Sequence, residues 1–157
     1  KAYGLPGLRI GWIACQDRAL LSRMERLKHY LSICNAGPSE RLALIGLKAR
    51  EAILTRNCAI VDNNLPLWEA FFTRHSDLFD WQPPQGSCMA FPRYKGPGGV
   101  EEFARKLVED SGVLLLPASI YQSELGSTPS DRFRIGLGRR GLSEGLDMMD
   151  AHLATVM

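Results

Sequence analysis

The chain opens with KAYGLPGLRIG, residues 1–11, and this stretch decides how the rest of the sequence is interpreted. Lys1 stands eight residues before Arg9, and glycines lie between and after them. Lysine offers a primary amine that condenses with carbonyl groups, and its pKa moves readily with its surroundings. Arginine offers a planar, permanently charged fork that suits a phosphate. Glycines let the backbone pass close to a bulky ligand. The alternative is that neither residue has a chemical role: Lys1 is a surface lysine, and Arg9 only flanks a strand.

The segments that follow predict a strand and then helices. The mostly apolar run Leu8–Cys15 predicts a short strand buried on both faces. Apolar residues recur every three or four positions from Arg18 to about Leu31, which predicts an amphipathic helix capped by Asp17. A long helical pattern then runs from about Pro38 to His75. Pro66 lies inside it and predicts a kink or a break.

The second half of the chain predicts a smaller unit of alternating strands and helices. We place the boundary at Pro66, so that the domains are residues 1–65 and 66–157. The order of elements makes the whole chain mixed α/β, and its second half α+β. The expected elements are strands near 87–94, 113–117 and 132–138, helices over 100–110 and 143–156, and a polar loop over 118–130.

A second arginine pair stands in DRFRIGLG, residues 131–138. Arg132 and Arg134 point to the same face if this strand is regular. A guanidinium can grip a carboxylate through two parallel hydrogen bonds and so fix the orientation of an amino acid. From the residue pattern alone, either arginine could do this, and a solvent-facing strand arginine would look the same.

Together, KAYGLPGLRIG, the long helix and DRFRIGLG resemble the C-terminal portion of the class I/II (fold type I) pyridoxal-phosphate-dependent aminotransferases, beginning at their active-site lysine. The resemblance implies the end of the large α/β domain, a long kinked linking helix and a small α+β domain. It implies that Lys1 forms the Schiff base with pyridoxal 5'-phosphate and is the catalytic residue. It also implies that Arg9 holds the cofactor phosphate and that Arg134, rather than Arg132, binds the substrate carboxylate.

Two further segments resemble the same family but depart from its usual pattern. Residues 84–91, PQGSCMAF, look like the strand near the substrate pocket, with Ser87 where a second glycine is usual. Residues 116–121, LPASIY, look like the segment that commonly reads Pro-Gly-x-x-Phe, with Ala118 in place of the glycine. For Cys88 and Tyr121 we favour an ordinary place in the core or pocket wall over a chemical role.

The activity implied by the resemblance is amino-group transfer from an amino acid to a 2-oxo acid, by a homodimer. The same fold also hosts lyases, decarboxylases and cyclases similar to capreomycidine synthase. The fold further occurs as the sensor domain of some transcription regulators. A last alternative is a structural or dimerisation unit that binds no cofactor. The family's pyridine-binding aspartate and ring-stacking aromatic lie upstream of its lysine. We therefore expect residues 1–157 by themselves to bind cofactor poorly and turn over little.

Composition narrows the remaining function classes. A net charge of +2 is too small for a surface that coats nucleic acid, and no apolar run approaches the length of a membrane span. Four well-separated cysteines form no CxxC pair and share no short spacing with the three histidines. We therefore expect no metal site, and we expect reduced thiols in a cytoplasmic protein.

Overall fold

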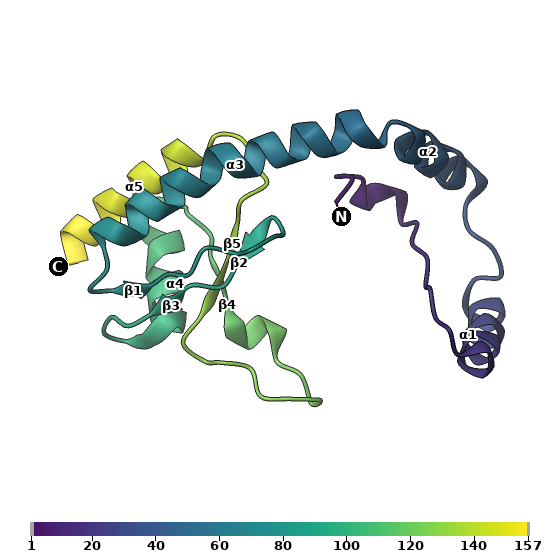
Figure 1. The fold of residues 1–157 in the computed structure, drawn as a ribbon. Coiled ribbons are helices and arrows are strands. Elements are labelled where there is room, and N and C mark those ends of the chain that lie inside the picture. The colour runs from purple at the N-terminus through teal and green to yellow at the C-terminus, as the bar shows by residue number, and fades with distance from the viewer. Residues whose placement is uncertain (1, 157) are drawn as a thin grey trace. The chain divides into compact units, whose positions relative to one another are not determined.

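The computed structural model describes residues 2–156 and shows mixed α/β structure, as the sequence predicts (Figure 1). The chain divides into two compact units between Asn57 and Cys58. This division falls inside one long helix, which also contains residues 65 and 66, where the domain boundary is predicted. The two units are described separately below.

The N-terminal unit consists of a loop and helices. After the short 3-10 helix η1 (Pro6–Leu8) come α1 (Arg18–Leu31), α2 (Gly37–Lys48) and the first part of α3 (Arg50–Arg74). The predicted cap is confirmed, because the Asp17 side chain accepts a hydrogen bond from the Leu20 backbone N–H at 3.0 Å. Gly46 is buried in the middle of α2, and a Cβ there would come within 2.9 Å of the Leu5 side chain. This glycine lets the N-terminal loop rest directly on the helix.

The strand predicted over Leu8–Cys15 is wrong. Residues 9–15 are irregular, and the side chains of Trp12 and Ile13 are 71% and 67% exposed. A strand needs neighbours to pair with its N–H and C=O groups. Within residues 2–156 no strand pairs with this segment, so its apolar pattern is not enough to make it extended.

Of the kink or break predicted at Pro66, the structure shows no break. The long helical pattern is interrupted at Ala49, between α2 and α3, and α3 continues through Pro66. Pro66 cannot bond to the carbonyl of Asp62, but both residues are exposed. Water can therefore hydrate the carbonyl that lacks a partner, which lowers the cost of a proline in a helix.

The C-terminal unit has two small antiparallel sheets packed with helices. The first sheet pairs β1 with β3, and the second has the strand order β2-β5-β4. The predicted strands are present but shorter, and the one expected over 87–94 is divided at Phe91 and the buried Pro92. The elements are β1 (Phe79–Asp80), β2 (Met89–Ala90), β3 (Arg93–Tyr94), α4 (Gly99–Ser111), β4 (Leu116–Pro117), the 3-10 helix η2 (Ala118–Tyr121), β5 (Phe133–Gly136) and α5 (Leu142–Val156).

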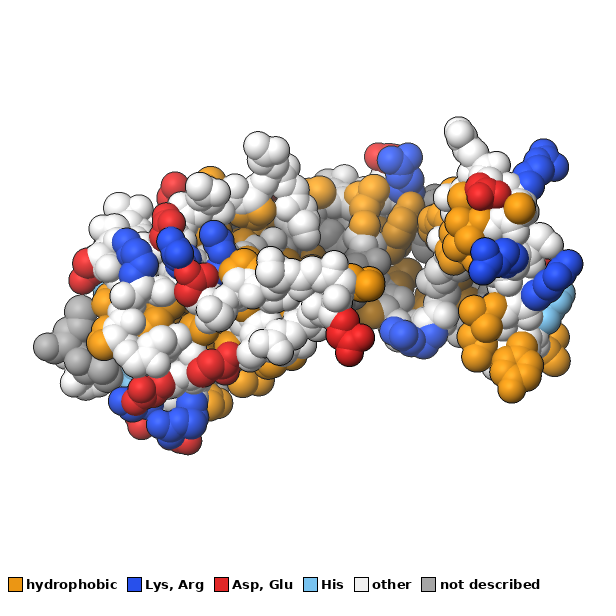
Figure 2. Space-filling view, turned by 90° about the horizontal axis from the view of Figure 1, so that it is seen from below, with side chains coloured by type: hydrophobic (Ala, Val, Ile, Leu, Met, Phe, Trp, Pro, Cys, Tyr) orange, Lys and Arg blue, Asp and Glu red, His pale blue; other side chains and the backbone are white. Residues whose placement is uncertain are grey.

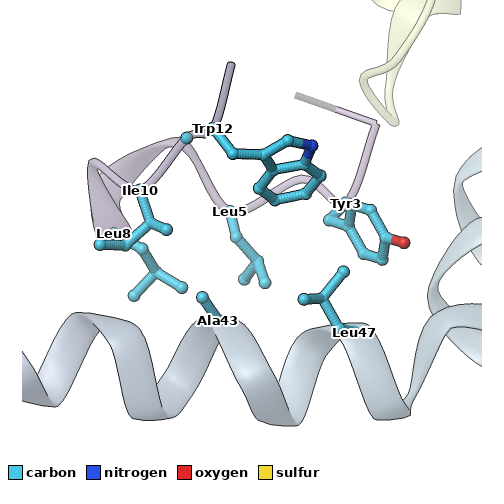
Figure 3. A pocket seen from close by; sticks show the side chains of 8 residues that line it. Tyr3, Leu5, Leu8, Ile10, Trp12, Ala43 and Leu47 are labelled. Atoms are coloured by element: carbon cyan, nitrogen blue, oxygen red, sulfur yellow. The ribbon is translucent and has the colours of Figure 1, made fainter. Parts of the chain in front are cut away.

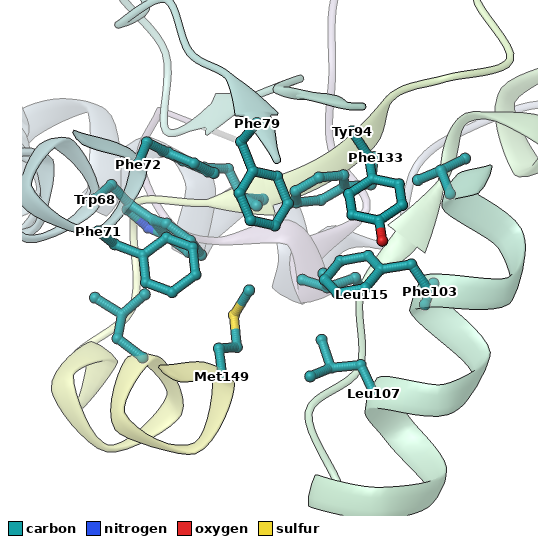
Figure 4. Packing of buried hydrophobic residues seen from close by; sticks show 14 of the residues in the cluster. Trp68, Phe71, Phe72, Phe79, Tyr94, Phe103, Leu107, Leu115, Phe133 and Met149 are labelled. Atoms are coloured by element: carbon teal, nitrogen blue, oxygen red, sulfur yellow. The ribbon is translucent and has the colours of Figure 1, made fainter. Parts of the chain in front are cut away.

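An aromatic core holds this unit together (Figure 4). Phe71 of α3 and Phe133 of β5 are fully buried, and each such side chain stabilises the fold by about 1.5–3 kcal/mol. Helix α4 contributes Phe103 and Leu107, and it is followed by Gly112, whose φ of 73° forms a left-handed C-terminal cap. Val108, the next residue along the helix, is exposed.

The segment after β5 is tied to α3 by one buried amide. Asn64 is 6% exposed, and its Nδ2 donates to the carbonyls of Leu137 at 2.8 Å and Arg139 at 2.6 Å. A buried carbonyl without a donor costs free energy, so this side chain satisfies backbone that the sheet leaves open. It fixes the path of the chain just beyond the strand that carries Arg134.

Candidate functional site

Arg134 lies on the face of β5 that points away from the aromatic core. Its neighbours Phe133 and Ile135 are buried, whereas Arg134 itself is half-buried, as the alternation of a strand requires. Its Nη1 donates a hydrogen bond to the hydroxyl of Tyr121 at 2.9 Å. Its Cζ also lies 5.9 Å from the centre of the Tyr121 ring, close enough for a cation–π interaction.

Arg132 has a different partner. Its Nη1 donates to the backbone carbonyl of Phe91 at 2.8 Å, and its backbone bridges to Arg93. Arg132 therefore ties β5 to the turn between β2 and β3. Arg134 instead bonds a side-chain hydroxyl, which can rearrange its own hydrogen bonds when a ligand arrives.

Arg134 is also free of any acidic partner in the described part of the chain. Some other arginines of this unit have one: Arg74 pairs with Asp150 at 2.6 Å, and Arg93 donates to Asp131. That hydrogen bond from Arg93 holds the pKa of the Asp131 carboxyl below its usual value. Among residues 2–156, no carboxylate forms such a pair with Arg134. Its positive charge is thus available to an external anion.

The sequence favours an ordinary place in the core or pocket wall for Tyr121, and the structure gives its hydroxyl a polar partner. It ends η2, which follows β4, and β4 pairs with β5 so that Leu116 lies opposite Arg134. The rings of Phe91 and Tyr121 meet edge to face, with centroids 5.4 Å apart. No local sequence signal joins Tyr121 to Arg134, because their contact depends on strand register.

The two departures from the glycine pattern are accommodated differently. Ser87 has a φ of 78°, a left-handed conformation that glycine adopts without cost and serine does not. Ala118 is fully buried and does not have a positive φ. A methyl group therefore fits at residue 118, whereas residue 87 keeps the backbone of a glycine without being one.

Arg9 occupies an unusual backbone conformation in the N-terminal unit. Its φ of 54° lies in the left-handed region, where its N–H bonds back to the Pro6 carbonyl at 3.3 Å. A residue other than glycine pays about 1 kcal/mol or more for this conformation. The Arg9 side chain is exposed, and among residues 2–156 it forms no ion pair. Strain at a free cation suits a role in binding an anion.

The loop that carries Arg9 is anchored within its own unit. Asn57 donates to the Ala2 carbonyl at 2.7 Å, and Leu5 points down to α2 between Ala43 and Leu47 (Figure 3). A cavity of about 270 Å³ is lined by side chains of both the loop and the helix, and these are mostly apolar. The phenol of Tyr3 is the one ionisable side chain in this lining. The lining residues are Tyr3, Leu5, Leu8, Ile10, Gly11, Trp12, Ala43 and Leu47.

The predicted site residues are thus divided among three places. Arg9 belongs to the N-terminal unit and Arg134 to the C-terminal unit. Lys1, the predicted catalytic residue, lies outside the described residues. Within residues 2–156, no cluster of three or more histidine, cysteine, aspartate or glutamate side chains could hold a metal ion. No helix in that range is long and apolar enough to cross a bilayer.

Comparison with known proteins places these residues in a family. The family model "Aminotransferase class I and II" matches residues 1–144. Capreomycidine synthase from Streptomyces vinaceus is 30% identical over 158 residues, which cover 99% of this chain and 39% of that protein.

Solved structures show the same fold. The PLP-dependent cyclase OrfR superposes with a TM-score of 0.85 at 25% identity, over 100% of this chain and 42% of its own. A PLP-dependent aminotransferase from Streptococcus suis gives 0.84 at 25% identity, over 99% and 40%. The chain therefore spans about two fifths of the length of these relatives.

Proposed function

The chain belongs to the class I and II aminotransferase family, and on that premise we propose that it works in an enzyme that transfers the amino group of an amino acid to a 2-oxo acid. The cofactor of this family is pyridoxal phosphate, and the fold is that of the C-terminal portion of fold type I enzymes. One observation carries the proposal: Arg134 presents a half-buried guanidinium that has a hydroxyl partner and no acidic one among residues 2–156.

The residues of this chain suit the two ends of the cofactor, its phosphate and its carbonyl group. Arg9 would hold the phosphate, because its permanently charged fork matches a phosphate group and is not neutralised by any carboxylate in the described part of the chain. Lys1 would hold the carbonyl end through its side-chain amine. When bound, pyridoxal phosphate withdraws electrons from the substrate α-carbon and stabilises the charge left there by a departing proton.

The chain's own residues would then bind, orient and deprotonate the substrate. Arg134 would grip the α-carboxylate and so fix the direction of the bond from the α-carbon to its hydrogen. The amine of Lys1 would move the proton at the α-carbon. As family members are generally homodimeric, we propose that the full-length protein is a homodimer as well.

A second candidate is intramolecular cyclisation of an amino acid. Two relatives favour it: capreomycidine synthase, at 30% identity, and the cyclase OrfR, at 25%. Both activities need the same carboxylate grip and the same lysine, so the residues of this chain are compatible with either.

Amino transfer and cyclisation can be distinguished because only amino transfer consumes a 2-oxo acid. We would incubate the full-length protein and pyridoxal phosphate with amino acids, with and without a 2-oxo acid, and analyse the products by mass spectrometry. Amino transfer predicts a new amino acid made from the oxo acid. A product formed from the amino acid alone, with no oxo acid consumed, identifies the cyclase. No reaction with any amino acid would contradict both proposals.

The role of Arg134 is tested against its neighbour. We expect Arg134→Gln to lower kcat/KM about 100-fold or more, because a charged pair with the substrate is lost. Arg132→Gln is the matched control, since this arginine bonds the carbonyl of Phe91, and it should retain most of the activity. The reverse order of effects would assign the carboxylate to Arg132.

The role of Arg9 is tested by a substitution that spares the fold. Arg9→Gly removes the guanidinium and also relieves the left-handed backbone. We expect the dissociation constant of pyridoxal phosphate to rise about 10-fold to 100-fold, with no loss of thermal stability. Unchanged cofactor affinity would show that another residue holds the phosphate.

A further inference from the structure

The hydrogen bond between Arg134 and Tyr121 has a fixed direction. A guanidinium carries only donors, so the Tyr121 oxygen must accept the bond from Arg134 Nη1 at 2.9 Å. The hydroxyl hydrogen of Tyr121 is then left to donate elsewhere. In the described part of the chain, the bond with Arg134 is the one hydrogen bond that the Tyr121 hydroxyl makes, so the hydroxyl hydrogen has no acceptor there.

The position of the Tyr121 ring is set by several contacts. Phe91 packs edge to face against it, and Thr128 Oγ1 bonds the Tyr121 carbonyl at 3.4 Å. Four residues earlier, Pro117 is paired with Phe133 in the sheet. The hydroxyl is therefore held beside Arg134 by the sheet itself and not by a long free loop.

The pair presents several donors and no negative charge. Arg134 has five N–H donors, of which one bonds Tyr121, and the phenol adds an O–H. A carboxylate has two oxygens with about four acceptor sites and can accept from both residues at once. A purely structural tyrosine would need only its ring, which phenylalanine also supplies.

We propose that Tyr121 is a second substrate-binding residue, which orients the Arg134 guanidinium and donates its own hydroxyl hydrogen to the same carboxylate. This rests on the proposed function insofar as Arg134 binds the substrate carboxylate. It goes further by assigning a role to a residue outside the arginine motif.

The test removes one oxygen atom from the full-length protein. In Tyr121→Phe, we expect the KM of the amino acid substrate to rise about 10-fold or more, while kcat changes by less than about twofold, because one hydrogen bond to a charged group is lost. Tyr94→Phe is the matched control, since Tyr94 also sits in this unit but bonds only the Pro97 carbonyl, at 3.4 Å. It should leave KM unchanged.

A binding measurement that needs no turnover separates the two proposals. We would titrate propanoate and its uncharged isostere propanamide into the wild-type protein, Tyr121→Phe and Arg134→Gln by ligand-observed NMR. We expect Tyr121→Phe to weaken propanoate by about 10-fold and leave propanamide unchanged, with a larger loss for Arg134→Gln. If Arg134→Gln loses propanoate but Tyr121→Phe does not, the role of Tyr121 is wrong and the proposed function stands. If the wild type does not prefer propanoate to propanamide, both the role of Tyr121 and the proposed function are wrong.

If Tyr121→Phe is too unstable to measure, a variant that keeps a polar group at this position provides the test. Glutamine at this position supplies both an acceptor and a donor. Propanoate affinity of Tyr121→Gln within about threefold of the wild type supports the hydroxyl's role. A loss as large as that of Arg134→Gln overturns it.

Discussion

The two units of the chain differ sharply in what their apolar residues contact. In the C-terminal unit, 18 hydrophobic residues are buried, from Trp68 to Leu153. In the described part of the N-terminal unit, Gly46 is the one buried residue. Apolar side chains there reach the surface, as the right-hand end of Figure 2 shows, and Tyr30 is 88% exposed. Similar amphipathic patterns thus form helices in both units, but only one unit contains the partners that bury them.

The difference shows that local patterns specify an element but not its partner. Helix α1 forms with the predicted bounds, yet none of its residues is buried. Helix α4 has a comparable pattern and buries Phe103 and Leu107 against the sheet. We expect the stability of the chain to reside mainly in the C-terminal unit.

The largest expected effect comes from truncating one side chain in each unit. Phe71→Ala should lower the free energy of unfolding by about 3–5 kcal/mol, because its ring is fully buried. Leu31→Ala, at a residue that is 69% exposed, should change it by no more than about 0.5 kcal/mol. Urea unfolding followed by circular dichroism measures both. Equal losses would show that the apolar surface of the N-terminal unit is packed after all.

Two asparagines offer a matched polar pair. Asn64 in the C-terminal unit and Asn57 in the N-terminal unit each donate to backbone carbonyls. Asn64→Leu should cost about 1–3 kcal/mol, because it leaves the buried carbonyl of Leu137 without a donor. Asn57→Leu should cost about 0.5 kcal/mol or less, since water replaces the amide at an exposed bond. The contrast fails if Asn57→Leu is the more damaging of the two in chemical denaturation.

Ser87 and Ala118, which both stand where the family usually has glycine, predict opposite changes in stability when each is replaced by glycine. Ser87→Gly should stabilise the protein by about 0.5–1 kcal/mol, because it relieves a left-handed φ. Ala118→Gly should destabilise it by about 1–2 kcal/mol, because it removes a buried methyl group and adds backbone freedom. Differential scanning calorimetry gives both signs. A lower melting temperature for Ser87→Gly would contradict the strain at that residue.

The smallest expected effect is pH-dependent and concerns the ion pairs. Arg93 lowers the pKa of Asp131 in the folded state, so the pair stabilises the protein above the usual carboxyl pKa of 3.8. That contribution, less than about 1 kcal/mol for so exposed a pair, is lost as pH falls below about 4 through the lowered folded-state pKa. Asp131→Asn should therefore be less stable than the wild type at neutral pH, and this difference should shrink as pH falls below about 4.

The N-terminal unit supplies the control for this pH dependence. Glu51 lies 3.9 Å from Arg50, and its side chain is 89% exposed. Glu51→Gln should leave the free energy of unfolding unchanged, within about 0.5 kcal/mol, across the same pH range. A difference between Asp131→Asn and the wild type that did not shrink in acid would point to a cause other than the ion pair.

Much of the fold could be predicted because its signals are local. The Asp17 cap and the helical spacing of residues 18–31 each act within a few positions. The strand predicted over Leu8–Cys15 is wrong because strands depend on distant partners. Of the kink or break predicted at Pro66, the break does not occur, because Pro66 and Asp62 are exposed and water can hydrate the carbonyl that lacks a partner.

The candidate site divides in the same way. Arg132 and Arg134 could be recognised as candidates from the alternation along one strand, but the choice of Arg134 comes from the family resemblance and stays a prediction. Tyr121, the partner of Arg134, could not be recognised, because that contact follows from the pairing of β4 with β5. The roles of Lys1 and Arg9 come from the family resemblance and stay predictions.

The central claim, that Lys1 holds pyridoxal phosphate, is tested most directly by covalent trapping. The full-length protein would be incubated with pyridoxal phosphate, reduced with borohydride, digested and analysed by mass spectrometry. The account predicts that the cofactor's mass is found on the peptide that contains Lys1 and disappears in Lys1→Ala. A cofactor mass on a different lysine, or on none, would contradict it.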